Sequence, residues 1–236
     1  KLGIAKEHLY KSLFAFVSIL GLIWFANQQI ERLRENVVYS KDGVYEKITI
    51  YENKFEGRPA RFFQQDRSGS GAMFLDSDDP ADLVYGYTKY YSLYKVFNTK
   101  ITNALVIGGG AYSIPKALLK EIPDANIDVA ETEPSLFELA KKYFRVNDNP
   151  RLRNYTEDGR RLLHDSDKKY DLIFSDVYYS LFSIPAHFTT QDFFTIAKDK
   201  LAPDGIFIAS MIGDLSRQEH SLIMSQIKTF QSVIPN

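Results

Sequence analysis

The pattern of apolar and polar residues changes its period near Asn103, and this change divides the chain. After that point, short apolar runs rich in β-branched residues alternate with stretches of helical spacing. We expect strands at residues 104–107, 127–131, 152–156, 171–175 and 206–210, and helices at residues 113–122, 134–144, 159–164, 191–201 and 216–230. Such alternation predicts an α/β fold, with a mostly parallel sheet and helices on both of its faces.

The residues before this region follow a period of two, which is typical of β-strands with one buried face. Strand character is found at residues 44–51, 60–65 and 72–75, and turns are expected at Glu56-Gly57 and at residues 68–71. We therefore expect a small antiparallel β domain at residues 37–79, followed by the α/β domain at residues 80–236.

A helix is expected where the two domains meet. The sequence Asp78-Asp79-Pro80 suits a helix start, because acids favour the first turn and proline the first position. The predicted helix, at residues 81–97, carries tyrosines at positions 85, 87, 90, 91 and 94. Most of these rings are expected to pack between the domains, with a minority facing a ligand.

The first 36 residues hold the most apolar segment of the chain. Residues 12–30 carry no charge, and Trp24 and Phe25 near one end suit a membrane interface. We expect membrane anchoring through this segment, with the rest of the chain in the cytoplasm; a helix buried against a partner subunit is the alternative. Because the chain starts at Lys1 and stops just after a helical pattern, we also expect it to be cut at both ends.

Composition narrows the classes of function. A chain of 236 residues that is 44% hydrophobic can bury the core of one large domain and an appendage. Its net charge of -1 gives no field that favours nucleic acid. The chain has no cysteine, and its four histidines lack ligand spacing, so no metal site is expected.

Three glycines and a later acid predict a nucleoside site. Gly108, Gly109 and Gly110 follow the first strand of the α/β region, where glycines let a backbone approach a ligand. Glu131 ends the next strand, at the distance where a carboxylate accepts hydrogen bonds from both ribose hydroxyls. The alternative is a plain turn, with Glu131 or Glu133 capping the following helix; for Glu133 that role is the favoured one.

Further polar residues fall at the ends of the next strands. Asp158-Gly159 follows the third strand, where Asp158 either accepts from an adenine amino group or caps a helix. Asp176 follows the fourth strand between apolar and aromatic residues, which favours a role at the reacting group. His187 lies in the loop before Thr190, the expected cap of the helix that follows; it either shapes that loop or contacts substrate.

The same segments resemble the spermidine synthase (polyamine aminopropyltransferase) family over nearly 200 residues. The matching segments are Leu105–Gly110, Val129–Pro134, Asn149–Gly159, Tyr170–Asp176 and Leu201–Gly205. Residues 183–193, Ser-Ile-Pro-Ala-His-Phe-Thr-Thr-Gln-Asp-Phe, are similar to spermidine synthase-like proteins of bacteria and archaea, some of which carry membrane helices before this domain.

This resemblance implies a Rossmann-type, methyltransferase-like sheet that binds decarboxylated S-adenosylmethionine or S-adenosylmethionine as co-substrate. It further implies that an amine attacks the aminopropyl carbon, with Asp176 as the base or the group that orients the amine. Gly108–Gly110, Glu131, Asp158 and Gly159 are expected to bind the nucleoside. Tyr85, Tyr178, Tyr179 and His187 are expected to line the amine site. We also expect a homodimer.

The chain departs from the family pattern where the family holds cationic amines. Ala111 replaces the acid of Gly-Gly-Gly-Asp, Tyr179 replaces the second acid of Asp-x-x-Asp, and Tyr87 falls near the glutamate of Tyr-His-Glu. The acceptor is therefore expected to differ from putrescine. An S-adenosylmethionine methyltransferase and a membrane-tethered non-catalytic binding module stay open as alternatives. A dehydrogenase is least favoured, because Ser113 stands where Gly-x-Gly-x-x-Gly needs its third glycine.

Overall fold

The computed structural model describes residues 16–24, 36–97, 100–178, 184–213 and 221–234. The chain separates into two compact units, residues 1–38 and residues 39–236. In the first unit, residues 16–24 form a helix whose side chains are exposed. No helix among the described residues is long and apolar enough to span a bilayer.

The predicted membrane segment, residues 12–30, lies partly outside the described residues. Membrane attachment therefore stays a prediction, as do the cytoplasmic location and the homodimer.

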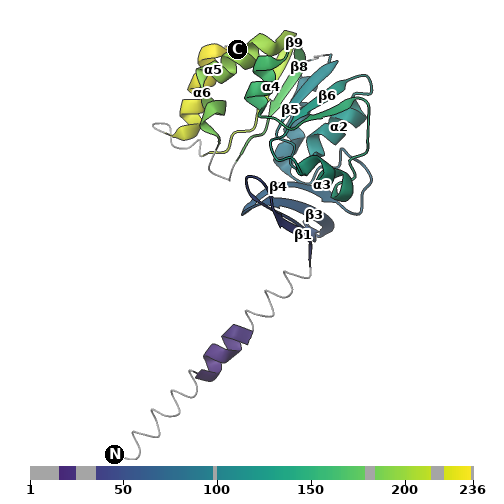
Figure 1. The fold of residues 1–236 in the computed structure, drawn as a ribbon, viewed down its shortest axis with the longest axis vertical. Coiled ribbons are helices and arrows are strands. Elements are labelled where there is room, and N and C mark those ends of the chain that lie inside the picture. The colour runs from purple at the N-terminus through teal and green to yellow at the C-terminus, as the bar shows by residue number, and fades with distance from the viewer. Residues whose placement is uncertain (1–15, 25–35, 98–99, 179–183, 214–220, 235–236) are drawn as a thin grey trace, which may run out of the picture. The chain divides into compact units, whose positions relative to one another are not determined.

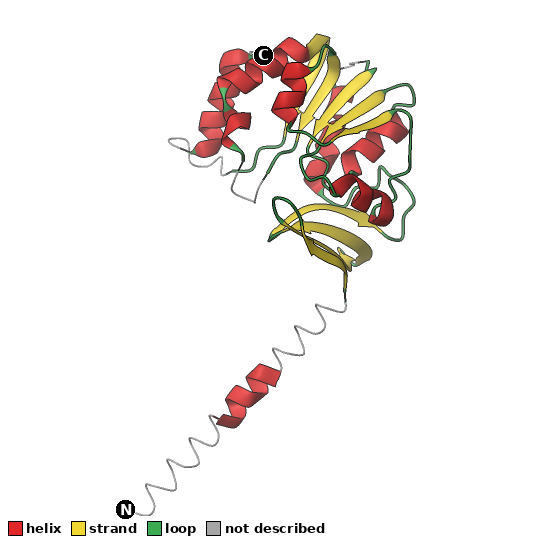
Figure 2. Cartoon of the chain, viewed as in Figure 1, coloured by secondary structure: helices red, strands yellow, loops and turns green. Residues whose placement is uncertain are grey.

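The small β domain is a sheet of four strands in the order β1-β2-β3-β4. Its strands are β1 Val37–Asp42, β2 Lys47–Phe55, β3 Arg58–Gln65 and β4 Ser68–Phe74 (Figure 2). Strand β3 pairs antiparallel with β2 and with β4. The turn predicted at Glu56-Gly57 is confirmed, since both residues have positive φ angles, 51° and 85°.

The structure corrects the sequence prediction at two places in this sheet. Residues 37–42 were assigned to the β domain without being recognised as a separate strand, and they form β1. Residues 68–71 were expected to form a turn but begin β4, since the chain reverses earlier, at Asp66, which has a φ of 49°. Glycine-rich sequence was misleading here: Gly71 serves close packing, as a Cβ on it would lie 2.5 Å from Ala111 Cβ.

The α/β region contains the predicted parallel sheet, in the order β7-β6-β5-β8-β9. Its strands are β5 Asn103–Ile107, β6 Asn126–Ala130, β7 Leu152–Tyr155, β8 Tyr170–Ser175 and β9 Leu201–Ala209. The helices are α2 Ser113–Glu121, α3 Leu136–Tyr143, α4 Gly159–Asp165, α5 Gln191–Lys200 and α6 Leu222–Val233 (Figure 1). The strand order reverses between β5 and β8, which is where ligands bind in open α/β sheets.

Both faces of the sheet are covered, because consecutive residues of β5 enter two different cores. Ala104 and Val106 pack in the core that contains α2 and α3, whereas Leu105 and Ile107 pack in the core that contains α4 and α5. The first core also includes Ile48, Phe63 and other apolar residues of the small sheet. The small β domain and the α/β region are therefore joined by shared apolar burial, in agreement with their single unit.

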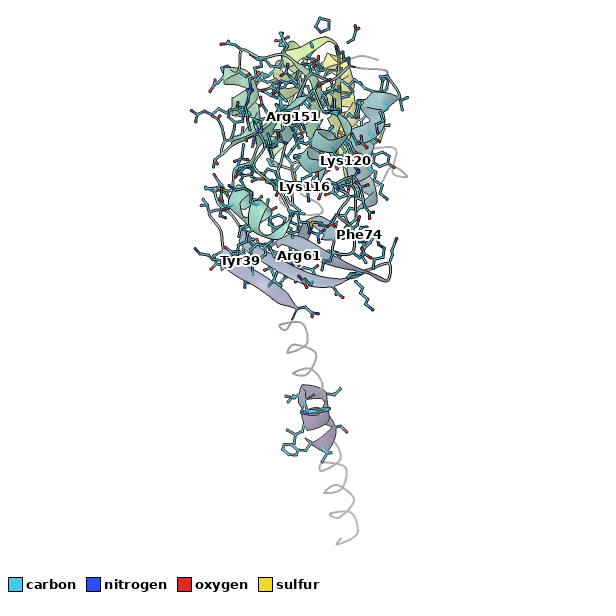
Figure 3. All side chains as sticks on the ribbon, turned by 90° about the vertical axis from the view of Figure 1, so that its right-hand side faces the viewer. Tyr39, Arg61, Phe74, Lys116, Lys120 and Arg151 are labelled. Atoms are coloured by element: carbon cyan, nitrogen blue, oxygen red, sulfur yellow. The ribbon has the colours of Figure 1, made fainter. Side chains whose placement is uncertain are left out.

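Cationic side chains reinforce this junction (Figure 3). Arg61 of β3 donates to the carbonyl oxygen of Tyr143, 2.7 Å away. Lys116 of α2 donates to the carbonyl oxygen of Phe144 at 2.5 Å, and burial lowers its pKa to about 8. Each cation meets a carbonyl near the end of α3, where helix carbonyls lack partners within the helix.

The helix predicted at residues 81–97 is a 3₁₀ segment, η1, over Gly86–Lys95. Its buried residues, Thr88, Tyr91 and Tyr94, recur at a spacing of three, which matches three residues per turn. The last helix begins at Leu222 with Ser221 as its cap. Residues 214–220, which include the predicted start of that helix, lie outside the described part of the chain.

Candidate active site

A cavity of about 470 Å³ lies at the carboxyl ends of the central strands. This volume falls in the range of small-molecule sites. The sheet side is lined by Ile107–Ala111, Ala130–Glu133, Asp158, Gly159, Asp176–Tyr178 and Ser210–Ile212. The small domain supplies Tyr45, Glu46, Gln65 and Ser68–Gly71; η1 supplies Tyr87 and Thr88; α2 supplies Ser113–Pro115; and Pro185, His187 and Phe188 complete the wall. Of the predicted nucleoside residues, Gly108–Gly110, Glu131, Asp158 and Gly159 all line this cavity.

The glycine loop after β5 needs glycine at two positions for steric reasons. Gly108 has a φ of 94°, and a Cβ on it would lie 2.2 Å from the carbonyl oxygen of Asp176. Gly110 has a φ of 52°, and a Cβ on it would lie 2.6 Å from the carbonyl oxygen of Ser70. These close approaches bring the loop against β8 on one side and β4 on the other.

Glu131 is buried and holds the glycine loop in place. One carboxylate oxygen, Oε2, accepts from the N–H of Gly109 at 2.8 Å, and the other accepts from the N–H of Glu133 at 2.9 Å. Burial has the largest effect on Glu131 and raises its pKa. The N–H groups of Gly110 and Thr132 oppose this effect, because they also stabilise the ionised carboxylate. Its hydrogen bonds to the protein are thus all to neighbouring backbone.

Glu133 precedes α3 but does not cap it as predicted, because the N-cap position is Ser135 and no side chain makes a capping hydrogen bond there. Its Oε1 accepts from the N–H and the hydroxyl of Ser135, at 3.2 and 2.7 Å. Its Oε2 accepts from the N–H of Val44, 2.7 Å away, in the loop between β1 and β2. The same carboxylate therefore ties the small domain to the α/β region.

Asp176 lies beside the glycine loop, and the hydroxyl groups of Ser210 and Tyr87 lie near its carboxylate. Its backbone N–H donates to the carbonyl oxygen of Ile107 at 2.9 Å. Burial raises the pKa of Asp176 to about 6, although hydrogen bonds from the hydroxyls of Ser210 and Tyr87 pull the pKa downward. A carboxylate with this pKa changes its charge near neutral pH, as a general base must.

The four residues expected in the amine site differ in their placement. Tyr178 lines the cavity, and its hydroxyl donates to the carbonyl oxygen of Ser210 at 3.1 Å. Tyr85 is not part of the lining: its ring packs against Phe55 and Tyr87, with ring centroids 5.9 Å apart in each pair. Tyr87, in the first turn of η1, lies near Asp176 instead. Tyr179 lies outside the described residues.

His187 and Asp158 face each other across the cavity wall. His187 Nε2 hydrogen-bonds Asp158 Oδ2 at 2.9 Å. The other oxygen of Asp158 accepts from the N–H groups of Arg160 and Arg161, at 3.0 and 3.1 Å, which makes Asp158 the cap of α4. Thr190, at the start of α5, accepts from the N–H of Phe193 at 3.1 Å, as predicted.

The cavity lining is strongly acidic. It includes five carboxylates, those of Glu46, Glu131, Glu133, Asp158 and Asp176. Its only basic side chain within the described residues is that of His187; no lysine or arginine is among them. No group of three or more potential metal ligands occurs in the described part of the chain.

Three polar lining residues that sequence reasoning missed are Tyr87, Ser210 and Glu46. Tyr87 stood out only as a departure from the family pattern, and Ser210 only as the last residue of a strand. Glu46 gave no signal at all, because it lies in the small domain and reaches the site through tertiary packing.

Comparisons with known proteins agree with this geometry. A model of the spermine/spermidine synthase domain matches residues 92–235. The chain belongs to the spermine/spermidine synthase family. Among its relatives, the polyamine aminopropyltransferase of Vibrio vulnificus is 24% identical over 192 residues, covering 79% of this chain and 63% of that protein. The polyamine aminopropyltransferase of Alkaliphilus oremlandii is 27% identical over 195 residues, covering 79% of this chain and 65% of that protein.

Solved structures give the same fold. Spermidine synthase from Thermotoga maritima superimposes with a TM-score of 0.67 at 20% identity, over 85% of this chain and 65% of that one. Human methyltransferase-like protein 13, in complex with SAH, superimposes with a TM-score of 0.51 at 25% identity, over 60% of this chain and 67% of that one. The chain spans less than two thirds of the length of the Vibrio and Alkaliphilus relatives.

Proposed function

We propose that this chain transfers an aminopropyl group from decarboxylated S-adenosylmethionine to an amine other than putrescine. The observation that carries the proposal is the charge of the cavity. Its described lining holds carboxylates and no lysine or arginine, and the donor carries two cationic groups, a sulfonium and a primary ammonium. Desolvated cations are stabilised where acceptors and negative charges surround them.

Asp176 is the residue we assign to the proton transfer. A primary amine is protonated near neutral pH, so its nitrogen attacks only after losing a proton. In the step, the acceptor nitrogen bonds to the aminopropyl carbon, the carbon–sulfur bond breaks, methylthioadenosine leaves, and the amine proton passes to Asp176. A carboxylate with its pKa raised to about 6 is a stronger base than an ordinary aspartate at 3.8.

The acceptor is inferred from what surrounds Asp176. Two of its neighbours are the hydroxyl groups of Tyr87 and Ser210, and the nearby wall carries Tyr178 and Met211. A diamine such as putrescine needs a second anion for its distal ammonium, and no other carboxylate is among the groups that shift the pKa of Asp176. Aromatic faces alone offer about 0.5–2 kcal/mol per cation–π contact. An amine with one charge and an apolar or aromatic body suits this wall better.

An S-adenosylmethionine methyltransferase is the second candidate, favoured by the likeness to human methyltransferase-like protein 13. Its donor carries an α-carboxylate, which the acidic lining would repel. A non-catalytic binding module is the third candidate: it predicts no turnover of either donor by the parent chain or by Asp176→Asn.

The test is a turnover assay that follows methylthioadenosine by chromatography. The purified chain is incubated with decarboxylated S-adenosylmethionine and a panel of monoamines and diamines. We expect methylthioadenosine and a propylamine adduct with a monoamine, faster than with putrescine. Methylated product from S-adenosylmethionine, without aminopropylated product, would favour the second candidate and contradict the first.

A further inference from the structure

Tyr112 is a buried tyrosine whose backbone has a conformation that glycine adopts far more readily. It is fully buried and occupies the N-cap position of α2, with a φ of 55° and a ψ of 28°. A Cβ atom disfavours this left-handed region, so the residue keeps it only where its surroundings fix it. Its hydroxyl donates to Asn154 Oδ1, and its ring centroid lies 5.4 Å from that of Phe137.

The hydroxyl of Tyr112 stays protonated and acts as a donor. Burial has the largest effect on the pKa of Tyr112 and raises it, and the negative charge of Glu131 raises it further. The acceptor, Asn154, belongs to β7, which is an edge strand of the parallel sheet. The hydrogen bond therefore ties the residue that follows the glycine loop to a strand on the far side of β6.

The ring of Tyr112 explains why the middle residue of the glycine loop is glycine. A Cβ on Gly109 would lie 2.7 Å from Cε2 and 2.9 Å from Cζ of Tyr112. Gly109 has no positive φ, so its backbone conformation alone would admit another residue. The N–H of Tyr112 also donates to the carbonyl oxygen of Gly109 at 2.8 Å. Tyr112 thus restrains Gly109 through its ring and through its backbone.

Gly109 transmits this restraint to the cavity. Its N–H donates to Glu131 Oε2, 2.8 Å away, and both residues line the cavity. Tyr112 is not part of the lining, so it acts on a ligand only through its neighbours. The nucleoside half of the cavity is the part lined by the predicted nucleoside residues, Gly108–Gly110, Glu131, Asp158 and Gly159.

We propose that Tyr112 is a positioning residue for the nucleoside half of the cavity: anchored on Asn154, its ring sets the place of Gly109 and, through Gly109, that of the Glu131 carboxylate. This inference rests on the proposed function, because it requires an adenosyl ligand in the cavity. Loss of the anchor should weaken the binding of donor and product alike. It should therefore raise KM and leave kcat nearly unchanged, which is the signature of lost uniform binding.

The test uses Tyr112→Phe and Asn154→Ala, which remove the same hydrogen bond from its two ends, and the double variant. Calorimetric titration with methylthioadenosine measures nucleoside binding, and turnover of decarboxylated S-adenosylmethionine separates KM from kcat. We expect each single variant to bind methylthioadenosine about fivefold to tenfold more weakly and to raise KM by a similar factor, with kcat changed by less than about threefold. The double variant should bind little more weakly than Asn154→Ala, because both substitutions remove one interaction.

The matched control is Tyr170→Phe. Tyr170 is also buried, and its hydroxyl donates to Asp128 Oδ2 at 3.0 Å, but neither residue lines the cavity. Tyr112→Phe and the control each lose one buried hydrogen bond, so both should lower the urea midpoint of unfolding. Only Tyr112→Phe should weaken methylthioadenosine binding, which separates positioning from a general loss of stability.

Three results would overturn the inference and leave the proposed function intact. They are unchanged methylthioadenosine binding in both single variants, additive weakening in the double variant, and a loss confined to kcat. Equal weakening of binding by Tyr170→Phe would also overturn it, because the effect would then follow stability alone. If the parent chain binds no methylthioadenosine, the proposed function and the inference both fail.

Discussion

Replacing Asp176 by asparagine should make the protein more stable near neutral pH, although it removes the proposed base. Burial raises the pKa of Asp176 from 3.8 to about 6. Because the folded-state pKa lies above the unfolded one, ionisation opposes folding. The stability that Asp176 contributes is complete below the unfolded pKa and is lost as pH rises through the folded pKa.

The size of the effect follows from that shift. With a pKa of about 6 in the folded state and 3.8 in the unfolded state, ionisation of Asp176 destabilises the fold by about 3 kcal/mol at about pH 8. At about pH 4 the same ionisation destabilises the fold by only about 0.5 kcal/mol. Asparagine keeps the shape of the side chain and an acceptor oxygen but carries no charge. We therefore expect the free energy of unfolding of Asp176→Asn to be about 2–3 kcal/mol higher than that of the parent at about pH 8. This difference should shrink as the pH is lowered.

Urea unfolding followed by circular dichroism at several pH values measures this difference directly. Asp148→Asn is the control, since that side chain is 89% exposed and its substitution should leave stability unchanged within about 0.5 kcal/mol. A pH-independent difference, or a variant less stable than the parent at about pH 8, would refute the reasoning. The same variant should lose about 10²- to 10⁴-fold in turnover, which is the magnitude of general-base catalysis.

Three further outcomes follow from the geometry. Gly108→Ala should destabilise the protein by about 2–4 kcal/mol in urea unfolding, because its Cβ would lie 2.2 Å from a carbonyl oxygen. The control Gly57→Ala, with a φ of 85° and nothing within 4 Å of its Cβ, should destabilise by about 1 kcal/mol. Similar losses of stability in both variants would contradict the steric argument. Tyr87→Phe removes a hydrogen bond to the ionised form of Asp176, so the acidic limb of the pH–rate profile should move to higher pH; an unmoved limb would count against that contact. Asp158→Ala removes the α4 cap and should lower the free energy of unfolding by about 1–2 kcal/mol. The same variant should bind methylthioadenosine more weakly in calorimetry. An unchanged affinity for methylthioadenosine would argue against a nucleoside role for Asp158.

The parallel sheet and its glycine loop could be predicted because local sequence determines them. Both faces of β5 are buried, so its apolar run is nearly continuous, and Gly108 follows where the backbone turns into a positive φ. Asp176 was found because the carboxyl ends of adjacent parallel strands meet at one edge. These signals depend on a few neighbouring residues and on the geometry of the sheet.

The remaining features depend on contacts between distant segments. The 3₁₀ geometry of η1 reflects burial of every third residue against α2 and the sheet. Tyr87, not Tyr85, lies near Asp176. Gly71 looked like a turn residue but allows β4 to approach Ala111. Glu46 reaches the cavity only because the small domain packs over it, and no local pattern reports that packing.

The measurement that tests the central claim most directly is calorimetric titration of the chain with decarboxylated S-adenosylmethionine and, separately, with S-adenosylmethionine. The two ligands share the same nucleoside and differ only in the α-carboxylate. An acidic cavity with no described lysine or arginine in its lining predicts saturable binding of the decarboxylated donor and at least tenfold weaker binding of the carboxylated one, about 1.4 kcal/mol apart. Tighter binding of S-adenosylmethionine, or heat from neither ligand, would contradict the account.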